Sequence, residues 1–328
     1  MTVSSPGAIE RVLERGSFCH VATSTALGPH VTPMVYAFTD GRLWVTTARG
    51  SVKAGVWRRD DRVAGLVQDE RTALSFTGRV RTFDALDPAT WGRALREAPV
   101  LALAAARFTA KNARFFAGYA VDARHIPLAW TPPGRVFAEL SIERAAIIEE
   151  GAVIRCLGAW PGAVPSHERF RALRAGGDPF GRLPTEVTEA IGRRGDGVLA
   201  VEGHGGVVVV PAPWAISGAG LYATPQESVL ALADLRTPAA PAALGIDRPS
   251  SWRAREMVGA MVRSTAQVHV VDRLVTGGRS ASSVIAAARG KPSARLGVEA
   301  GSGAVVVALS PERIVWWRGW SSGTAVAP

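Results

Sequence analysis

A series of short β-strand patterns joined by tight turns between Gly16 and Arg81 constrains the fold more than any other feature of this 328-residue chain. The patterns read HVATST, HVTPMVYAF, RLWVTTA, RVAGLVQD and ALSFTGRVR. Leu27-Gly28-Pro29 and Asp40-Gly41 stand between the first three, where hairpins need their turns. Strands with such short connections must pair antiparallel, because a parallel return needs a longer crossover. The stretch therefore predicts a meander that curls into a small barrel.

Four short motifs follow one another in this stretch, namely GPHVTP, DGRLWVTT, SVK and DDRVAG. Their order and spacing resemble the pyridoxamine 5'-phosphate oxidase-like family of flavin-binding split barrels, which also contains deazaflavin-dependent reductases. The resemblance covers residues 16–81 and is weaker elsewhere. It implies a split barrel that binds FMN, or alternatively the deazaflavin F-420, and an oxidoreductase that acts on a small organic substrate.

Composition and charge exclude several other classes of protein. The chain is 47% hydrophobic and 20% charged, which is typical of a globular protein of about two domains. It contains no apolar run long enough for a transmembrane helix and no signal-peptide pattern, so we expect a cytoplasmic protein without membrane partners. The net charge of +10 comes from scattered arginines without a nucleic-acid-binding motif. We therefore attribute it to composition and an anionic cofactor, and expect no nucleic-acid partner.

Cysteine and histidine usage predicts neither disulfides nor a metal site. Cys19 and Cys156 lie in apolar strand patterns and are expected to be buried thiols. No Cys/His cluster has the spacing of zinc ligands.

The strongest chemical signal is the sequence TTARGSVK, which ends a strand and opens a short helix. A helix start offers free backbone N–H groups to a phosphate, and arginine can bind phosphate in a bidentate manner. The hydroxyl and cationic side chains that we expect to bind a cofactor phosphate are Thr46, Thr47, Arg49, Ser51 and Lys53. The alternative is a solvated turn in which Ser51 is an ordinary N-cap.

The strand HVTPMVYAF contains Pro33, which cannot donate to a β-ladder, so this strand is expected to be an edge or bulged strand at that point. In the family that the chain resembles, this strand lies along the flavin. The resemblance therefore implies that Pro33, Met34 and Val35 align the ring through their backbone. No catalytic residue can be identified.

An internal repeat predicts a second barrel. VFAELSIERAAIIEEG, from Val136, aligns without gaps with VVVALSPERIVWWRGW, from Val305. Upstream, Pro33 aligns with Pro211 and Leu43 with Leu221, and Gly78 falls near Ser264. We predict a mainly β chain (α+β) of two tandem antiparallel split barrels with peripheral helices. The expected domains are 1–155 with the phosphate site, a linker at 156–182, and a degenerate barrel at 183–328.

The second copy departs from the first where the phosphate would bind. Glu227, Val229 and Ala231 replace Arg49, Ser51 and Lys53. The cationic side chains are lost and Glu227 would repel a phosphate, so we expect one competent site and one silent site. Members of the family are commonly homodimers with the cofactor at the interface. The tandem chain could form this dimer internally, or two chains could form a homodimer.

Three functions remain open from the sequence. The first is a redox enzyme whose flavin or deazaflavin carries a hydride, which would explain the absence of a visible acid–base pair. The second is a non-catalytic flavin- or haem-binding protein, and the third is a pseudoenzyme with two silent sites. Trp214 and Trp252 are candidates to line a substrate pocket, whereas His204 in EGHGG is expected at the surface.

Overall fold

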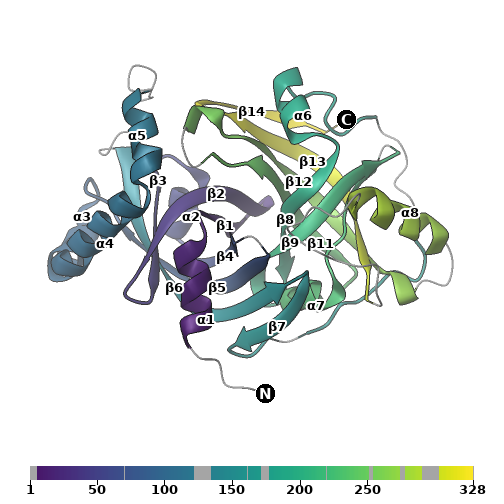
Figure 1. The fold of residues 1–328 in the computed structure, drawn as a ribbon, viewed down its shortest axis with the longest axis horizontal. Helices are drawn as coiled ribbons and strands as arrows, with labels where there is room; N and C mark the ends of the chain where they lie inside the picture. The colour runs from purple at the N-terminus through teal and green to yellow at the C-terminus, as the bar shows by residue number, and fades with distance from the viewer. Residues whose placement is uncertain are drawn as a thin grey trace.

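The structure is a computed structural model that describes residues 6–69, 71–121, 134–160, 162–170, 177–218, 220–250, 254–273, 278–289 and 303–327. These residues form two seven-stranded antiparallel sheets that lie side by side (Figure 1). Each sheet contains one half of the chain, so the two halves can be compared element by element.

The first half begins with helix α1 (Pro6–Arg15). Its strands are β1 (Phe18–Thr25), β2 (Gly28–Thr39), β3 (Arg42–Ala48), β4 (Arg62–Asp69), β5 (Thr72–Phe83), β6 (Arg135–Glu149) and β7 (Ala152–Leu157). Helix α2 (Val52–Trp57) lies between β3 and β4. Helices α3 (Pro88–Arg96), α4 (Ala98–Lys111) and α5 (Ala113–Val121) lie between β5 and β6 and extend from the left of the molecule in Figure 1.

The second half begins with helix α6 (Thr185–Ile191). Its strands are β8 (Arg194–Gly203), β9 (Gly206–Ser217), β10 (Gly220–Ala223), β11 (Ala239–Arg248), β12 (Val258–Val270), β13 (Val305–Arg318) and β14 (Ser321–Val326). Helix α7 (Glu227–Leu230) follows β10, and helix α8 (Gly278–Arg289) lies between β12 and β13. Single-turn 3₁₀ helices span Ala231–Ala233, Ala254–Glu256 and Val271–Arg273.

The strand order is the same in both sheets. It is β3-β2-β1-β4-β5-β6-β7 in the first and β10-β9-β8-β11-β12-β13-β14 in the second. An additional β3–β6 pairing closes the first six strands into a barrel, and β10–β13 does the same in the second half. The predicted fold class, two antiparallel split barrels with peripheral helices, is confirmed.

The strand registers match the equivalences expected from the sequence. Pro33 lies opposite His20, and Pro211 lies opposite Val198 at the same place in the second sheet. The shared L-S-x-E-R sequence forms a β-bulge in both halves. The register shifts between Thr77 and Gly78 in β5, and between Arg263 and Ser264 in β12, so that one glutamate on the facing strand has no partner residue in each case.

The helical segment between β5 and β6 is broken twice. Residues 85–117 have a helical sequence pattern throughout, and the structure divides them at Glu97 and Asn112, neither of which adopts helical dihedral angles. Asp87 is the N-cap of α3, since its side chain accepts a hydrogen bond of 3.1 Å from the N–H of Ala89. No helix in the described part of the chain is long and apolar enough to cross a membrane.

One hydrophobic core cluster spans both barrels, while the interior of the first barrel forms a separate cluster. The core cluster of the second half also contains buried residues of the first, among them Ala22, Val31 and Leu66. Polar contacts cross the same contact surface: the Ser75 hydroxyl donates a hydrogen bond of 2.7 Å to the carbonyl of Val209, and both atoms lie in buried residues. The barrels therefore stabilise each other through apolar burial.

The expectation of two buried thiols is wrong for one of them. Cys19 is buried in the first barrel, but Cys156 is exposed. Cys156 lies on β7, which extends the sheet beyond the closed barrel and pairs only with β6 among the described strands. Cys156 therefore stays exposed although its neighbours in the sequence are apolar.

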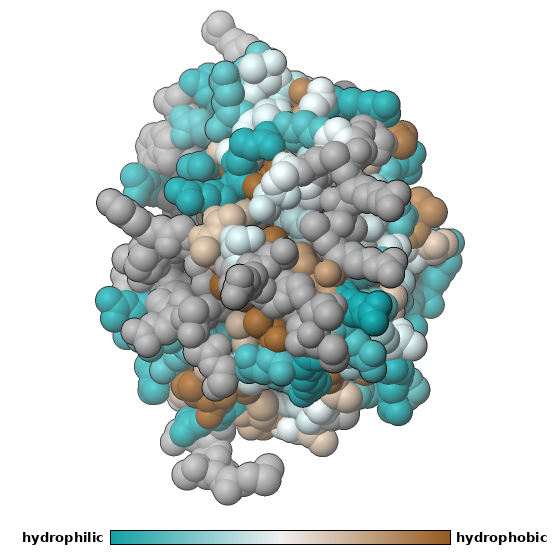
Figure 2. All heavy atoms as spheres, turned by 90° about the vertical axis from the view of Figure 1, so that its right-hand side faces the viewer, coloured by the Kyte–Doolittle hydropathy of each residue, from teal (hydrophilic) through white to brown (hydrophobic). Residues whose placement is uncertain are grey.

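On the outer face of the second barrel, hydrophobic side chains lie in small areas between hydrophilic ones (Figure 2).

Candidate functional site

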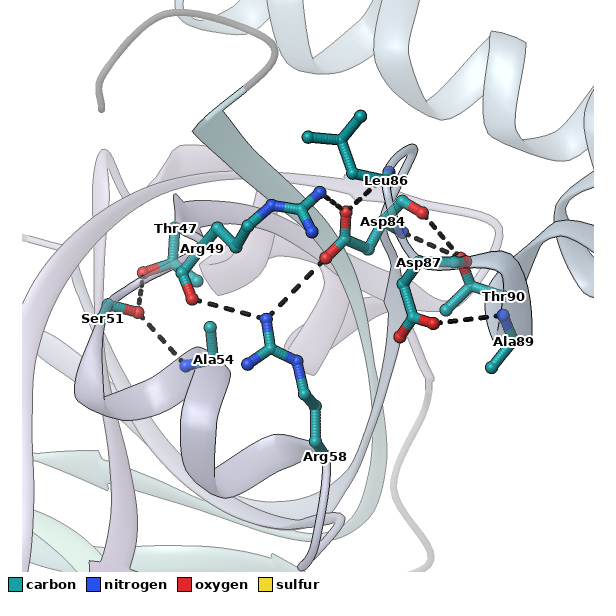
Figure 3. A network of polar contacts seen from close by, with 10 residues as sticks. All are labelled: Thr47, Arg49, Ser51, Ala54, Arg58, Asp84, Leu86, Asp87, Ala89 and Thr90. Atoms are coloured by element: carbon teal, nitrogen blue, oxygen red, sulfur yellow. Dashed lines mark hydrogen bonds and ion pairs between the residues drawn. The ribbon is translucent and has the colours of Figure 1, made fainter. Parts of the chain in front are cut away.

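The loop between β3 and α2 is held by hydroxyl groups. The Oγ1 of Thr47 and the Oγ of Ser51 are hydrogen-bonded at 2.9 Å, and the Ser51 hydroxyl also accepts a bond of 3.1 Å from the N–H of Ala54 (Figure 3). Ser51 is therefore the N-cap of α2, as one of the two interpretations of the sequence required. The structure brings Thr47 and Ser51 together at the start of the helix.

Arg49 forms an ion pair with Asp84, a residue that the sequence analysis did not single out. Asp84 has a side chain that is 3% exposed, and its other oxygen lies 3.8 Å from the guanidinium of Arg58 (Figure 3). The same carboxylate accepts a bond of 3.0 Å from the N–H of Leu86. Two arginines thus share one buried carboxylate, which leaves one net positive charge beside the loop.

Thr46 is bound by Arg135, the first residue of β6. The guanidinium donates 2.9 Å and 2.8 Å hydrogen bonds to the Oγ1 and to the carbonyl oxygen of Thr46. Thr46 therefore lies within reach of a further cation, but its hydroxyl is already used in this contact.

Lys53 is turned into the protein. Its side chain is buried and donates a hydrogen bond to the Oγ1 of Thr32 on β2. Burial lowers the pKa of Lys53 to about 7, because desolvation disfavours the ammonium form. The expected convergence of Arg49 and Lys53 on one point is not observed. Arg49 precedes α2 and reaches Asp84, whereas Lys53 lies on the buried side of α2 and reaches Thr32.

The predicted ring-binding residues lie on β2 where that strand has a single described partner strand. Residues 28–35 pair with β1, and pairing with β3 begins only at Tyr36, so Pro33 lies on a one-sided segment as expected. The side chain of Met34 is part of the barrel core. Val35 lines a cavity of about 310 Å³ together with Phe18 and Lys111.

A residue of the second barrel completes a buried basic cluster here. Arg263 on β12 is 7% exposed, and its Nη2 lies 3.3 Å from the Nδ1 of His30 on β2. Its Nε has no hydrogen-bond partner among the described residues. Burial, then Lys53 and Arg263, lowers the pKa of His30 to about 2. Within the described residues, none of Lys53, His30 and Arg263 has a carboxylate partner. Uncompensated basic groups are costly to bury.

The corresponding loop of the second barrel carries the opposite arrangement of charges. Glu227, which the sequence alignment places at Arg49, is the first residue of α7 and forms an ion pair with Arg273. The Arg273 guanidinium also donates a bond of 2.7 Å to the carbonyl of Val164. Helix α7 has four residues, and Ala231 and Gly162 line a cavity beside it. The cationic character of the first loop is thus absent from the second.

A buried histidine distinguishes the second barrel further. His269 lies five residues after the bulge at Ser264, as Phe83 lies five residues after Gly78. His269 is 2% exposed, and neither ring nitrogen has a hydrogen-bond partner in the part of the chain that the structure describes. Burial, then the neighbouring His167, lowers the pKa of His269 to about 4. The imidazole is therefore neutral in the folded protein at neutral pH.

We predict that His269→Phe removes an acid sensitivity from the protein. Between pH 6.5 and about 4 the histidine binds a proton in the unfolded state but not in the folded state. The free energy of unfolding of the wild type therefore decreases as the pH is lowered, by up to about 1.4 kcal/mol per pH unit. The variant lacks this loss. Urea unfolding at pH 7.0 and 5.0 measures it, and equal losses for the two proteins would contradict the assignment.

The chain is similar to one family profile and to several solved structures. A family profile described as "Pyridoxamine 5'-phosphate oxidase" matches residues 5–111. Three solved structures are similar. A pyridoxamine 5'-phosphate oxidase-related, FMN-binding protein from Nostoc punctiforme is 18% identical over 45% of this chain and 85% of its own, with a TM-score of 0.33. A FAD-binding protein from Mesorhizobium loti is 19% identical over 44% of this chain and 94% of its own, with a TM-score of 0.31, and an F-420 reductase is 19% identical over 42% of this chain and 94% of its own, with a TM-score of 0.28. No curated protein sequence matches the chain.

Among the described residues, no group of three or more His, Cys, Asp or Glu side chains could hold a metal ion.

Proposed function

Because the first barrel belongs to the pyridoxamine 5'-phosphate oxidase family, we propose that this chain is a flavin- or deazaflavin-dependent oxidoreductase with one cofactor site, in the first barrel. The observation that carries the proposal is the buried basic cluster of Lys53, His30 and Arg263, which has no carboxylate partner in the described part of the chain. An anionic cofactor would supply the missing charge.

The residues present fit such a cofactor. The unpartnered Nε of Arg263 and the buried ammonium of Lys53 can bind acceptor atoms of an anion, because a buried donor without a partner is costly. Thr47, Ser51 and Arg49 stand at the adjoining loop. When bound, the flavin or deazaflavin supplies hydride transfer, and the protein supplies binding and orientation. FMN is our first choice and F-420 the alternative.

The position of Arg263 supports a site that draws on both barrels. Arg263 comes from the second half of the chain and contacts His30 in the first, so one chain holds both contributors. The second loop carries the Glu227–Arg273 ion pair, and the carboxylate of Glu227 would repel a phosphate. We propose an intrachain pseudo-dimer with one functional site and one silent site. A non-catalytic flavin carrier would use the same contacts and differs only in turnover.

The proposal predicts a stoichiometry and a residue dependence. FMN and F-420, titrated separately against the purified protein by calorimetry, should give about one equivalent of one cofactor per chain. Lys53→Met should weaken that binding by more than about 1 kcal/mol, because a charge-assisted contact is lost. The matched change in the silent loop, Glu227→Ala, should leave the affinity unchanged.

Four results would count against the proposal. Binding of neither cofactor would leave a haem carrier or a scaffold as the better explanation. Two equivalents per chain would show that the second loop also binds. Unchanged affinity in Lys53→Met would remove the basic cluster from the site. Bound cofactor that is never reduced or oxidised by any tested substrate class would favour the carrier.

A further inference from the structure

A separate cavity of about 710 Å³ lies between the two barrels. Its volume is in the range of ordinary small-molecule sites. None of its lining residues belongs to the basic cluster or to the loop at Thr46–Lys53. The lining comes from corresponding parts of the two halves, namely the starts of β1 and β8 and the ends of β4 and β11. The cavity therefore lies where the two barrels meet with equivalent elements.

The wall of this cavity contains a histidine–aspartate pair that has no counterpart at the symmetry-related positions of the two halves. His20 Nε2 and Asp247 Oδ1 are 2.8 Å apart, and their side chains are 10% and 5% exposed. His20 pairs with Leu66, and its equivalent Val198 pairs with Gly245. Asp247 follows Gly245 by two residues, as Gln68 follows Leu66. The symmetry-related pair would thus be Val198 and Gln68, which cannot form this contact. The two halves have diverged to place one histidine–aspartate pair here.

Two buried donor or acceptor groups in the lining have no hydrogen-bond partner among the residues that the structure describes. They are the Nδ1 of His20 and the Nε1 of Trp214, whose side chain is fully buried. A buried polar atom without a partner costs free energy unless a ligand or water satisfies it. Trp214 was a pocket candidate in the sequence and does line this cavity, whereas Trp252 lies outside the described residues.

The charged residues of the lining are unbalanced. Four arginines face three aspartates, and Asp69 and Asp247 already contact Arg15 and His20. Arg71, Arg194 and Arg248 are exposed and form no ion pair with any described residue. The apolar part of the lining consists of Phe18, Ala73, Ile191, Trp214 and Ile246. The cavity combines an apolar wall with a cationic rim.

We propose that this cavity is a second ligand site that takes a small organic acid. The acid group, a carboxylate, sulfonate or phosphate ester, faces the rim arginines, since arginine is the side chain best suited to bind such groups. The apolar body lies against Phe18 and Ile246. His20, oriented by Asp247, adds a polar side chain to this wall. The proposal is independent of the cofactor site.

The probe for this site is 8-anilinonaphthalene-1-sulfonate, an aromatic acid whose fluorescence rises on binding. We expect the double variant Arg194→Glu/Arg248→Glu to bind it at least about tenfold more weakly than wild type, because two charge-assisted contacts become repulsive. The control Arg96→Glu/Arg107→Glu carries the same charge change on α3 and α4 and should stay within about twofold. Benzoate should displace the probe, and orthophosphate at the same concentration should not.

Each opposite result overturns the proposal. Equal binding by the cavity variant and the control would show that the rim arginines hold no ligand. Loss of binding in Lys53→Met but not in the cavity variant would place the probe at the candidate cofactor site. Displacement by orthophosphate as effective as that by benzoate would contradict an organic acid. Because the substituted arginines are exposed, thermal unfolding should show both double variants folded.

Discussion

Gly78→Ala is expected to lower the free energy of unfolding by about 3 kcal/mol. Gly78 lies at the bulge of β5, and a Cβ placed on it would lie 1.8 Å from the carbonyl oxygen of Ser141 on β6. Because the obstacle is backbone in the longest strand pairing of the first barrel, it cannot move aside without breaking the β5–β6 ladder. Urea unfolding of the variant and the wild type measures the loss.

The matched control for this prediction is Gly50→Ala. A Cβ on Gly50 meets nothing within 4 Å, so stability should change by less than about 0.5 kcal/mol. The second barrel carries Ser264 at the equivalent bulge, which shows that the bulge itself accepts a side chain. The cost at Gly78 therefore belongs to the close approach of Ser141. A loss below about 0.5 kcal/mol in Gly78→Ala would contradict it.

The fold could be predicted because its signals are local. Alternating strand patterns and turn glycines such as Gly28 and Gly41, both with positive φ, define hairpins within a few residues. The repeat could be aligned because both halves contain the sequence L-S-x-E-R. In the structure this sequence forms the same bulge twice, opposite Gly78 in one half and Ser264 in the other. The subdivision of the helical segment was missed, although Pro99 in the first turn of α4 is a usable signal for the break at Glu97. Asn112 carries no comparable signal.

The site could be predicted only in part, because its partners are distant in sequence. Thr47 and Ser51 are four residues apart and their contact follows from the N-cap. Asp84 is 35 residues from Arg49, and an aspartate before a helix is ordinarily a cap or a surface residue. Arg263 is 233 residues from His30, and only the packing of the two barrels brings them together. No local pattern carries that information.

The titration of Lys53 is expected to make the free energy of unfolding strongly dependent on pH. In the folded protein its pKa is about 7, against the ordinary lysine value of 10.5 that applies to the unfolded chain. Above pH 7 the folded state has released this proton while the unfolded state still holds it. Unfolding then takes up a proton, so the free energy of unfolding rises with pH by about 1.4 kcal/mol per unit. Below pH 7 the buried ammonium must be accommodated, and the rise is absent.

Lys53→Met should therefore lose this pH dependence. Between pH 7.5 and 9.0 the wild type should gain about 2 kcal/mol relative to the variant. The window ends at pH 9, because above it Cys19, whose pKa is raised to about 12 by burial, begins to contribute with the opposite sign. Lys111 titrates in both proteins, so within this window the difference between the two unfolding curves isolates Lys53.

The same measurement also tests the site without any enzymatic assay. An anion bound beside Lys53 favours its charged form and raises its pKa, so a saturating cofactor should flatten the rise in stability between pH 7.5 and 9.0 in the wild type. In Lys53→Met the cofactor should leave the pH dependence as it is. A parallel pH dependence of wild type and variant without cofactor would show that Lys53 is not held as a buried, desolvated amine, and the basic cluster would then give no reason for an anion at this place.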